Sequence, residues 1–474
     1  MGEIGDTVIG PVYEARRISR HRGAPAPVVV RVLALALAVG ACTGGDGTTP
    51  ATTTPIPTTR PAPTPAPTAP ATTSQAPATT STTAPESGVE VWADPTIVGA
   101  LESVASDFTA RTGIAVAVEE RAFASIRADV LAAAVDGSGP DLFVGSHSWT
   151  QELVTAGAVA PVVLIPQTVR DAFLAPALEA FTLDARLYAV PYAAETVALW
   201  ANTSLVGTAV PATFDELLDR CDTLAPDRVC LAVPGGAGLP DAYYQFPIVS
   251  AFGGSIFHRV EGVGYDLDSA GIDSPESLVA YQYLADLSLG EYLPPLDYTA
   301  AKASFVEGEV AYWLTGLWER ADVASAAETR GFEFATLAIP PIEGNPARPF
   351  VEVQGVFLAA EASPQAATFL LSTIASADAL AELYSGEPQL PTHSDVAAAI
   401  SDPLVVPFAD GVAVGIPTPN LVAMTDEVWK IWGDALAAIR DRRVTTPEEA
   451  ITAAARRIRG MLGIPEPEVP PPIE

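Results

Sequence analysis

Three carboxylates beside apolar or aromatic residues are the side chains of this sequence that could do chemistry. They are Glu119, Glu195 in the stretch VPYAAETVALW, and Asp241 in the stretch LPDAYYQFP. Two such groups could serve as the acid and the base that hydrolyse a glycosidic bond. They could equally be solvated or hydrogen-bonding carboxylates, because the chain holds 57 Asp and Glu residues. The motifs HExxH, GxSxG and GxGxxG and the Walker A loop do not occur, so we expect a protein that is not an enzyme.

Aromatic residues in turn-like contexts form the second candidate group: Trp149, Tyr192, Tyr243, Tyr244, Trp318 and Trp429. A flat apolar ring with a polar tip suits a sugar, which has apolar C–H faces and a rim of hydroxyl groups. Any single aromatic residue is nevertheless more often part of a core. Three further tryptophans lie in apolar periodic runs and are assigned to the core: Trp200, Trp313 and Trp432.

The segment GPDLFVGSHSW, residues 139–149, places polar side chains directly after an apolar run. Its glycine would let the backbone approach a ligand, its serines and histidine offer hydrogen-bonding groups, and its tryptophan can stack or shield. These residues are Gly145, Ser146, His147, Ser148 and Trp149. The alternative is an ordinary strand-ending turn whose tryptophan packs on Val154. Since the four histidines of the chain are scattered, neither a metal site nor a cofactor is expected.

The spacing of apolar residues predicts the elements that position these groups. Residues 89–92, 114–118 and 142–144 have the pattern of strands, and residues 97–108 and 123–135 have the pattern of helices. This alternation predicts a parallel sheet with helices on both faces, and ligands bind beyond the carboxyl ends of such strands. Alternating signals continue over the rest of the chain, which is too long for one open sheet, so two lobes are expected.

The first 87 residues predict export and a lipid anchor. Five arginines within the first 31 residues precede the apolar run VLALALAVGA, which is typical of a signal peptide over residues 1–41. The run ends at Cys42 in a sequence that resembles a bacterial lipobox, and the alternative is a secretory signal with a stray cysteine. Residues 43–87 contain 16 threonines and 10 prolines, which predicts an extended disordered tether.

With Cys42 assigned to the anchor, Cys221 and Cys230 remain as a candidate disulfide pair. An exported compartment permits such a bond, and two separate buried thiols are the alternative. The formal net charge of the chain is −32. A surface of this sign repels phosphate backbones and anionic headgroups, so no nucleic-acid partner is expected and membrane contact is expected through the lipid alone.

The order of segments from about Val89 to Leu462 resembles the extracellular solute-binding proteins of ABC importers, specifically the maltose/maltodextrin-binding group. The resemblance is carried by the shared order of segments across nearly the whole folded region: DFTARTGIAVAVEE, GSGPDLFVGSHSWTQELVTAGAVAPV, LYAVPYAAETVALWANTSLV, PATFDELLD, AYYQFPIVSAFGG, YDLDSAGIDSPESLVAYQYLADL, FVEGEVAYWLTGLWERADV, LAIPPIEGNPARPFVEVQGVFLAA and PTPNLVAMTDEVWKIWGDAL. It implies an α/β fold of two lobes joined by three crossings, with a hinge and a ligand cleft between them. The first lobe is expected at 88–193 and about 353–398, the second at about 194–352 and 399–464, and a flexible tail at 465–474.

The resemblance also implies a set of ligand-binding residues. By position, Glu119 and Glu195 match acidic sugar ligands of the family. Asp241 matches an acidic residue that stacking aromatics follow, and those aromatics are Tyr243 and Tyr244 here.

Further matches and departures come from the other segments. Trp318 and Trp429 match two tryptophan platforms, and His147 and Ser148 fall in a loop that carries a histidine and an aspartate in the maltose-binding group. The lysine of the family's first-strand loop has no counterpart, and only Asp94 is nearby. These departures remove charged hydroxyl-binding groups from the first lobe, while the aromatic residues of the second lobe remain.

We therefore expect a monomeric, lipid-anchored receptor outside the cytoplasm that binds a maltodextrin-like oligosaccharide and delivers it to the permease of an ABC importer. Two alternatives remain open from the sequence. One is a binding protein of the same fold with a solute that is not a sugar, and the other is a secreted hydrolase that processes carbohydrates.

Overall fold

The computed structural model describes residues 88–164, 167–236, 241–260, 264–386, 389–421 and 424–467. The predicted signal peptide, the predicted lipidation site Cys42 and the predicted tether at 43–87 lie outside the described residues. Of the predicted tail, residues 468–474 also lie outside them.

The first described elements alternate between strand and helix: β1(Val89–Ala93), α1(Val98–Thr112), β2(Val116–Glu120), α2(Phe123–Ala133) and β3(Leu142–Ser146). Helix α1 buries Leu101, Val104 and Phe108, which follow one another at intervals of three and four residues along one helical face, and its C-cap is Gly113. The φ of Gly113 is 78°, a left-handed conformation that glycine adopts with little strain. Strand β1 pairs in parallel with both β2 and β3, which confirms the predicted βαβαβ unit.

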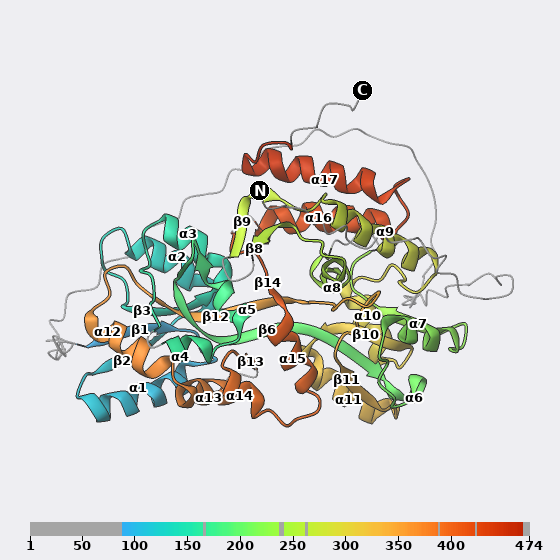
Figure 1. Ribbon diagram of the computed structural model, residues 1–474. Coiled ribbons are helices and arrows are strands. Elements are labelled where there is room, and N and C mark those ends of the chain that lie inside the picture. The colour runs from blue at the N-terminus through green and yellow to red at the C-terminus, as the bar shows by residue number, and fades with distance from the viewer. Residues whose placement is uncertain are drawn as a thin grey trace, which may run out of the picture. The chain divides into compact units, whose positions relative to one another are not determined.

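Within the described residues a ten-stranded sheet has the order β2-β1-β3-β12-β6-β10-β7, with β11, β13 and β14 paired beside this path. The strand β6(Ala189–Asn202) is 14 residues long and changes its neighbour along its length. Up to Thr196 it pairs with β12(Phe350–Leu358), and from Val197 onward it pairs with β10(Val310–Gly316). Figure 1 shows β6 as the long strand that joins the two parts of the sheet. One strand thus belongs to both halves of a two-lobed α/β fold.

The remaining elements up to β12 connect and cover these strands. Between β3 and β6 lie η1(His147–Trp149), α3(Thr150–Thr155), α4(Gln167–Asp171), α5(Ala175–Ala180), β4(Thr182–Leu183) and β5(Arg186–Leu187). Between β6 and β12 lie α6(Thr203–Val206), α7(Phe214–Asp222), β7(Val229–Ala232), η2(Tyr243–Gln245), α8(Phe246–Ala251), β8(Phe257–Val260), β9(Gly264–Ala270), α9(Pro275–Leu289), α10(Tyr298–Val306), β10, η3(Leu317–Glu319), α11(Arg320–Arg330) and β11(Phe334–Leu337).

The last part of the chain contains α12(Pro364–Phe369), the π-helix η4(Leu370–Ile374), α13(Ala377–Gly386), β13(Leu390–Pro391), α14(Ser394–Ala398), α15(Val406–Val414), β14(Ile416–Pro417), the π-helix η5(Met424–Val428), α16(Trp429–Arg440) and α17(Pro447–Leu462). Helix α17 begins at an N-cap, because the hydroxyl of Thr446 accepts a hydrogen bond from the N–H of Glu449 at 3.3 Å. Helices α16, α17 and α9 pack against one another (Figure 1).

Two hydrophobic clusters support the sheet. One contains Phe143 and Phe357, whose rings stack with centroids 5.1 Å apart, and it continues to Trp200 and Trp313. The other lies around α9, α16 and α17 and contains Trp432. The side chains of Trp200, Trp313 and Trp432 are fully buried, which confirms their assignment to the core.

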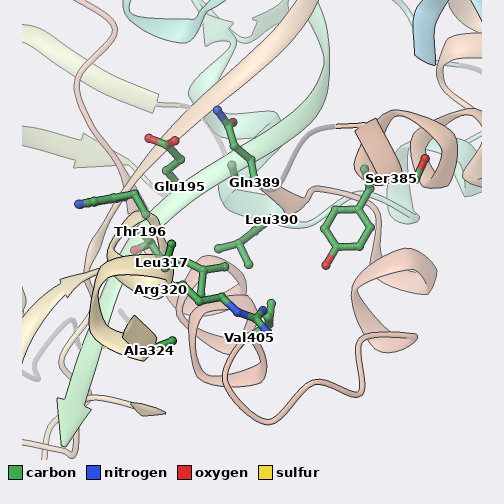
Figure 2. A pocket seen from close by; sticks show the side chains of 13 residues that line it. Glu195, Thr196, Leu317, Arg320, Ala324, Ser385, Gln389, Leu390 and Val405 are labelled. Carbon is green, nitrogen blue, oxygen red and sulfur yellow. The ribbon is translucent and has the colours of Figure 1, made fainter. Parts of the chain in front are cut away.

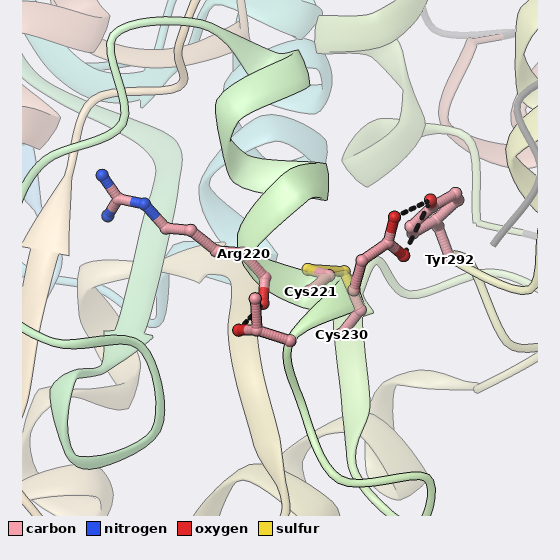
Figure 3. The surroundings of a disulfide bond; sticks show 6 residues. Arg220, Cys221, Cys230 and Tyr292 are labelled. Atoms are coloured by element: carbon pink, nitrogen blue, oxygen red, sulfur yellow. Dashed lines mark hydrogen bonds between the residues drawn. A yellow bond between two sulfur atoms is a disulfide. The ribbon is translucent and has the colours of Figure 1, made fainter. Parts of the chain in front are cut away.

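A disulfide bond joins Cys221, in α7, to Cys230, in β7, with Cα atoms 5.1 Å apart. Figure 3 shows its surroundings, where the hydroxyl of Tyr292 donates to both carboxylate oxygens of Asp222 at 3.0 and 3.1 Å. The bond therefore ties the end of a helix to the strand that follows it, beside a tyrosine–aspartate contact.

Among the described residues, no single helix combines the length and the apolar composition needed to cross a membrane. One helix pair, Pro364–Ile374 with Ala377–Ser385, meets these criteria only when taken together, and the two parts are bent by 80°. Phe369, Leu370 and Leu380 of this pair are fully buried, which is the environment of core helices. The described residues also contain no group of three or more His, Cys, Asp or Glu side chains that could hold a metal ion.

Candidate functional site

A row of five aromatic side chains forms the centre of the candidate site: Trp318, Tyr298, Tyr244, Tyr243 and Trp429. The indole Nε1 of Trp318 donates to the hydroxyl of Tyr298 at 2.8 Å. Ring centroids are 5.6 Å apart between Tyr298 and Tyr244, 5.5 Å between Tyr244 and Tyr243, and 6.4 Å between Tyr243 and Trp429. Four of the five were predicted from the sequence, and Tyr298 was not.

The row is assembled from four separate turns. Tyr243 and Tyr244 lie in the short turn η2, Trp318 lies in η3 directly after β10, and Tyr298 and Trp429 are the first residues of α10 and α16. Tyr298 lies within the segment DYTAAKASF and was not among the aromatic residues selected from the sequence. The local signal was the preceding residue Asp297, a helix N-cap whose side chain accepts a hydrogen bond from the N–H of Ala300. Only the packing of α10 against β10 brings its first residue to Trp318.

Gly316 determines how the Trp318 side chain lies. Its φ of −88° and ψ of 175° are open to any residue, so the backbone alone does not require glycine here. A Cβ atom at this position would overlap the indole ring of Trp318. The six-membered ring of the indole therefore lies against Gly316 at the end of β10, with 45% of the residue exposed. An exposed, backed ring face of this kind can stack against a sugar ring.

At the end of β3, Gly145 likewise makes room for the ring of a nearby tryptophan, Trp149. A Cβ at Gly145 would come within 2.6 Å of the Trp149 indole and 3.1 Å of the Phe357 ring. The close neighbour that Gly145 admits is thus the indole of its own turn, and its role in approaching a ligand stays a prediction. Trp149 is half-buried and packs on Phe123, with ring centroids 5.0 Å apart.

The two serines of the same turn bond to each other. Their Oγ atoms are 2.9 Å apart, and the Oγ of Ser146 also accepts from the N–H of Ser148 at 3.2 Å. Both residues are half-buried at the carboxyl end of β3. This mutual bond uses only one of the two O–H donors, so the other hydroxyl can still donate to a ligand.

His147 is fully buried, and both of its ring nitrogens have partners. The N–H of Val353 donates to Nδ1 at 3.1 Å, and Nε2 lies 3.0 Å from the carbonyl oxygen and 2.9 Å from the Oγ1 of Thr418. With Nδ1 accepting from the N–H of Val353, Nε2 can donate to Thr418. In this structure the imidazole therefore connects three chain segments and does not face a cavity.

Glu119 and Asp94, the other two residues predicted to bind a ligand from the first lobe, have contrasting environments. Glu119 is about half exposed and pairs with Arg121 at 2.8 Å, and the guanidinium of Arg121 lies 4.0 Å from the centroid of the Trp92 ring. Asp94, just after β1, is 5% exposed. Its Oδ1 accepts from the N–H of Thr96 at 3.0 Å, whereas its buried Oδ2 has no hydrogen-bond partner among the described residues. That oxygen is an acceptor buried inside the protein.

A cavity of about 740 Å³ contains Glu195 and Trp318 among its lining residues. It is bordered by β6, by η3 and α11, and by the chain around α13 and β13; Figure 2 shows Glu195 and Gln389 on one side, with Arg320 and Val405 on another. This volume is typical of pockets for small ligands. Apolar side chains and a few polar groups line it, a composition suited to a ligand with both apolar faces and hydroxyl groups.

Two glutamates lie opposite each other where β6 and β12 pair. Glu195 is the register partner of Glu352, and Glu352 accepts a hydrogen bond from the Oγ1 of Thr418 at 2.6 Å. Burial, followed by the charges of Glu352 and Glu195, raises the pKa of Tyr243 well above its ordinary value. The phenol of Tyr243 thus stays protonated near neutral pH and can donate a hydrogen bond.

Asp241 has an unusual environment for a carboxylate. Desolvation by burial raises its pKa to about 6, although hydrogen bonds from the backbone of Tyr243 and Tyr244 and the charge of Arg440 act in the opposite direction. Arg440 is itself buried and donates to the carbonyl oxygen of Val233 at 2.8 Å. Perturbed carboxyl groups next to an aromatic cluster are typical of binding sites, although ion-pair networks produce them as well.

The structure brings together only part of the predicted set. Tyr243, Tyr244, Trp318 and Trp429 form one row, and Glu195 shares a cavity with Trp318. The predicted residues of the first half lie around the ends of β1, β2 and β3, outside the lining of that cavity: Asp94, Glu119, Ser146, His147, Ser148 and Trp149.

The two-part sheet, the crossing strands β6 and β12 and the backed aromatic row define a two-lobed α/β binding protein. A profile described as bacterial extracellular solute-binding protein matches residues 103–406. Because this match covers more than half of the chain, the protein belongs to the family of bacterial extracellular solute-binding proteins.

Two curated relatives and two solved structures are similar to this chain. The maltotriose-binding protein of Pyrococcus abyssi (strain GE5 / Orsay) is 27% identical over 326 residues, which cover 66% of this chain and 68% of the relative. The galactooligosaccharide-binding protein of Bacillus subtilis (strain 168) is 22% identical over 395 residues, which cover 79% of this chain and 90% of the relative.

Of the solved structures, a cyclo/maltodextrin-binding protein complexed with maltotetraose superposes with a TM-score of 0.70 at 27% identity, covering 79% of this chain and 97% of that one. An extracellular solute-binding protein from Staphylococcus aureus in complex with maltose superposes with a TM-score of 0.71 at 24% identity, covering 80% and 99%. The second likeness concerns the fold alone.

Proposed function

We propose that this protein captures an oligosaccharide of the maltodextrin type outside the cytoplasm and passes it to an ABC importer. The observation that carries the proposal is the row of aromatic residues from Trp318 to Trp429 next to a cavity that contains Glu195. Backed ring faces hold the apolar faces of a sugar, and a carboxylate accepts hydrogen bonds from its hydroxyl groups. The names of the relatives support this ligand class, since two bind oligosaccharides and one solved structure holds maltotetraose.

The ligand-binding set and the lobe boundaries are part of the proposal. In it, Asp94, Glu119 and the 146–149 turn contribute from the first lobe, at 88–193 and about 353–398. Glu195, Asp241 and the aromatic row contribute from the second lobe, at about 194–352 and 399–464. The change of neighbours along β6 near Thr196 supports a boundary close to this residue. Buried His147 would take part by holding the crossing segments together.

The test is isothermal titration calorimetry of the purified protein with maltotriose, trehalose, a galactooligosaccharide and a short peptide, followed by chromatography of each mixture. Binding of one oligosaccharide that is recovered intact is the expected result. Binding of the peptide alone would instead support the same fold with a non-sugar solute. Recovery of cleaved sugar would support the hydrolase alternative.

We also propose that Cys42 carries a lipid that anchors the protein to the outer face of the cell membrane. The lipobox-like sequence before Cys42 and the threonine- and proline-rich stretch after it support this part of the proposal. In cells that express the full chain, Cys42→Ala is expected to move the protein from the membrane fraction to the medium. An unchanged distribution would contradict the anchor without affecting the proposal for sugar binding.

A further inference from the structure

Trp318 needs support beyond the strand on which it lies. Almost half of the residue is exposed, and it lies in η3, a turn of three residues. An exposed indole can change its rotamer freely unless a second contact holds it. If binding must first order the stacking ring, the entropy cost of that ordering weakens the affinity of the protein for its ligand.

The second contact is a hydrogen bond to Tyr298. The indole N–H of Trp318 can only donate, and it does so to the Tyr298 hydroxyl at 2.8 Å. The Tyr298 hydroxyl in turn donates to Oε1 of Glu319. Because a carboxylate only accepts, the phenol O–H must point toward Glu319. The lone pairs of the phenol oxygen are then free to accept the indole N–H.

Glu319 is itself held in place. It is 3% exposed, and the ammonium Nζ of Lys302 lies 2.9 Å from its Oε2. Lys302 also pairs with Asp322 at 2.6 Å from the solvent side. A buried carboxylate requires such a partner, because an unpaired buried charge is strongly unfavourable. Burial and the bond to Glu319 raise the pKa of Tyr298, which keeps the phenol protonated and able to donate.

We propose that Tyr298, oriented by Glu319 and Lys302, is a positioning residue that holds the Trp318 indole in the conformation that stacks on the ligand. This inference rests on the proposed function and deepens it, because it names residues that act on the sugar only through Trp318. The four side chains form one relay, a chain of polar contacts from Lys302 through Glu319 and Tyr298 to Trp318. The relay joins the starts of α10 and α11 across the end of β10.

A double-mutant cycle tests the inference. Affinity for maltotriose is measured by calorimetry for the wild-type protein, Tyr298→Phe, Trp318→Ala and the double variant. Tyr298→Phe is expected to lower the affinity by about three- to ten-fold, the range of one lost hydrogen bond. In the Trp318→Ala background the same change is expected to have an effect of less than about two-fold, because the group through which it acts is gone. Equal effects in both backgrounds would overturn the inference.

Two further variants separate the relay from general stability. Lys302→Met acts from the partly exposed end of the relay and is expected to lower the affinity in the same direction as Tyr298→Phe. Tyr292→Phe is the matched control, because it also removes a hydrogen bond from a tyrosine hydroxyl to a carboxylate, that of Asp222 beside the disulfide. It is expected to leave the affinity unchanged. Equal losses in Tyr292→Phe and Tyr298→Phe would contradict a specific positioning role.

A readout without ligand distinguishes this inference from the proposed function. The contribution of Trp318 to the fluorescence emission is obtained as the difference between matched proteins with and without this tryptophan. In Tyr298→Phe that contribution is expected to shift to longer wavelength, because the released indole becomes more exposed to water. If the wild-type protein binds no sugar, the proposed function fails, and an unshifted emission of Trp318 would overturn the positioning role separately.

Discussion

The imidazole of His147 joins two segments that are 271 residues apart, because its Nε2 lies 2.9 Å from the hydroxyl and 3.0 Å from the carbonyl oxygen of Thr418. Its other nitrogen accepts from the N–H of Val353, in β12. One buried ring thus connects the end of β3 with β12 and with the chain after β14. A histidine in a polar turn of a binding protein is here a structural connector.

His147→Ala is expected to lower the free energy of unfolding by about 2 to 4 kcal/mol. The substitution leaves a cavity and leaves the N–H of Val353 and the carbonyl of Thr418 without this partner. Urea denaturation followed by circular dichroism measures the change. His258→Ala, at an exposed position, is the control and is expected to shift stability by less than about 0.5 kcal/mol. A loss in the two variants of the same size would contradict the connecting role.

Trp318→Ala is expected to weaken oligosaccharide binding by about 1 to 3 kcal/mol while the melting temperature changes little. The reason is that the residue is 45% exposed, so its removal takes away little buried contact within the protein. Calorimetry and thermal unfolding of the same samples provide the two measurements. Tyr243→Ala should also weaken binding, but it is expected to reduce stability as well, since Tyr243 stacks on Phe350 with ring centroids 6.1 Å apart. Unchanged affinity in both variants would remove the proposed site.

Gly316→Ala is expected to displace the Trp318 indole and to lower sugar affinity, although the backbone angles of Gly316 suit alanine. The added methyl group would occupy the space of the ring. Gly460→Ala is the matched control, because a Cβ there meets nothing within 4 Å. The comparison uses the titrations described above together with indole fluorescence. An unchanged affinity for sugar in Gly316→Ala would mean that binding does not require the Trp318 indole to lie against residue 316.

Asp241 predicts a dependence of stability on pH. Burial raises its pKa in the folded protein from 3.8 to about 6, so between these values the folded state retains a proton that the unfolded state has released. Its contribution to stability is therefore largest near pH 4, falls as the pH rises to about 6, and changes little above that. The loss is at most about 3 kcal/mol.

The Asp241→Asn variant isolates this contribution, because asparagine does not titrate. Denaturation at several pH values between 4 and 7 is expected to show a steeper decrease with rising pH for the wild-type protein than for the variant. If the two profiles run parallel, Asp241 does not titrate with a raised pKa in the folded state.

The disulfide between Cys221 and Cys230 is expected to contribute about 2 to 3 kcal/mol, the value for closing a loop of roughly ten residues in the unfolded chain. The double variant Cys221→Ser with Cys230→Ser should therefore unfold at lower denaturant concentration than the oxidised wild-type protein. Reduction of the wild-type protein should bring the two curves close together. A reductant-insensitive wild-type curve would indicate that the two thiols are not bonded in solution.

Local patterns in the sequence were sufficient for the elements and for most of the aromatic row. The first three strands and the first two helices were placed within a few residues, because each depends on the spacing of its own apolar side chains. Trp200, Trp313 and Trp432 were assigned to the core for the same reason. Tyr192 was grouped with turn residues, yet it is buried near the start of β6, where its hydroxyl donates to Gln354 at 2.6 Å.

Only the tertiary structure decided which polar groups face each other. Tyr298 joins Trp318 because α10 packs on β10, and His147 is buried because β3 and β12 are neighbours in the sheet although they are two hundred residues apart in the chain. Such pairings depend on the strand order, which short-range periodicity does not encode. The sequence by itself determined the residue types, the helices and the strands. The sheet order determined the partners, and with them the division between residues that line the candidate site and residues that support it.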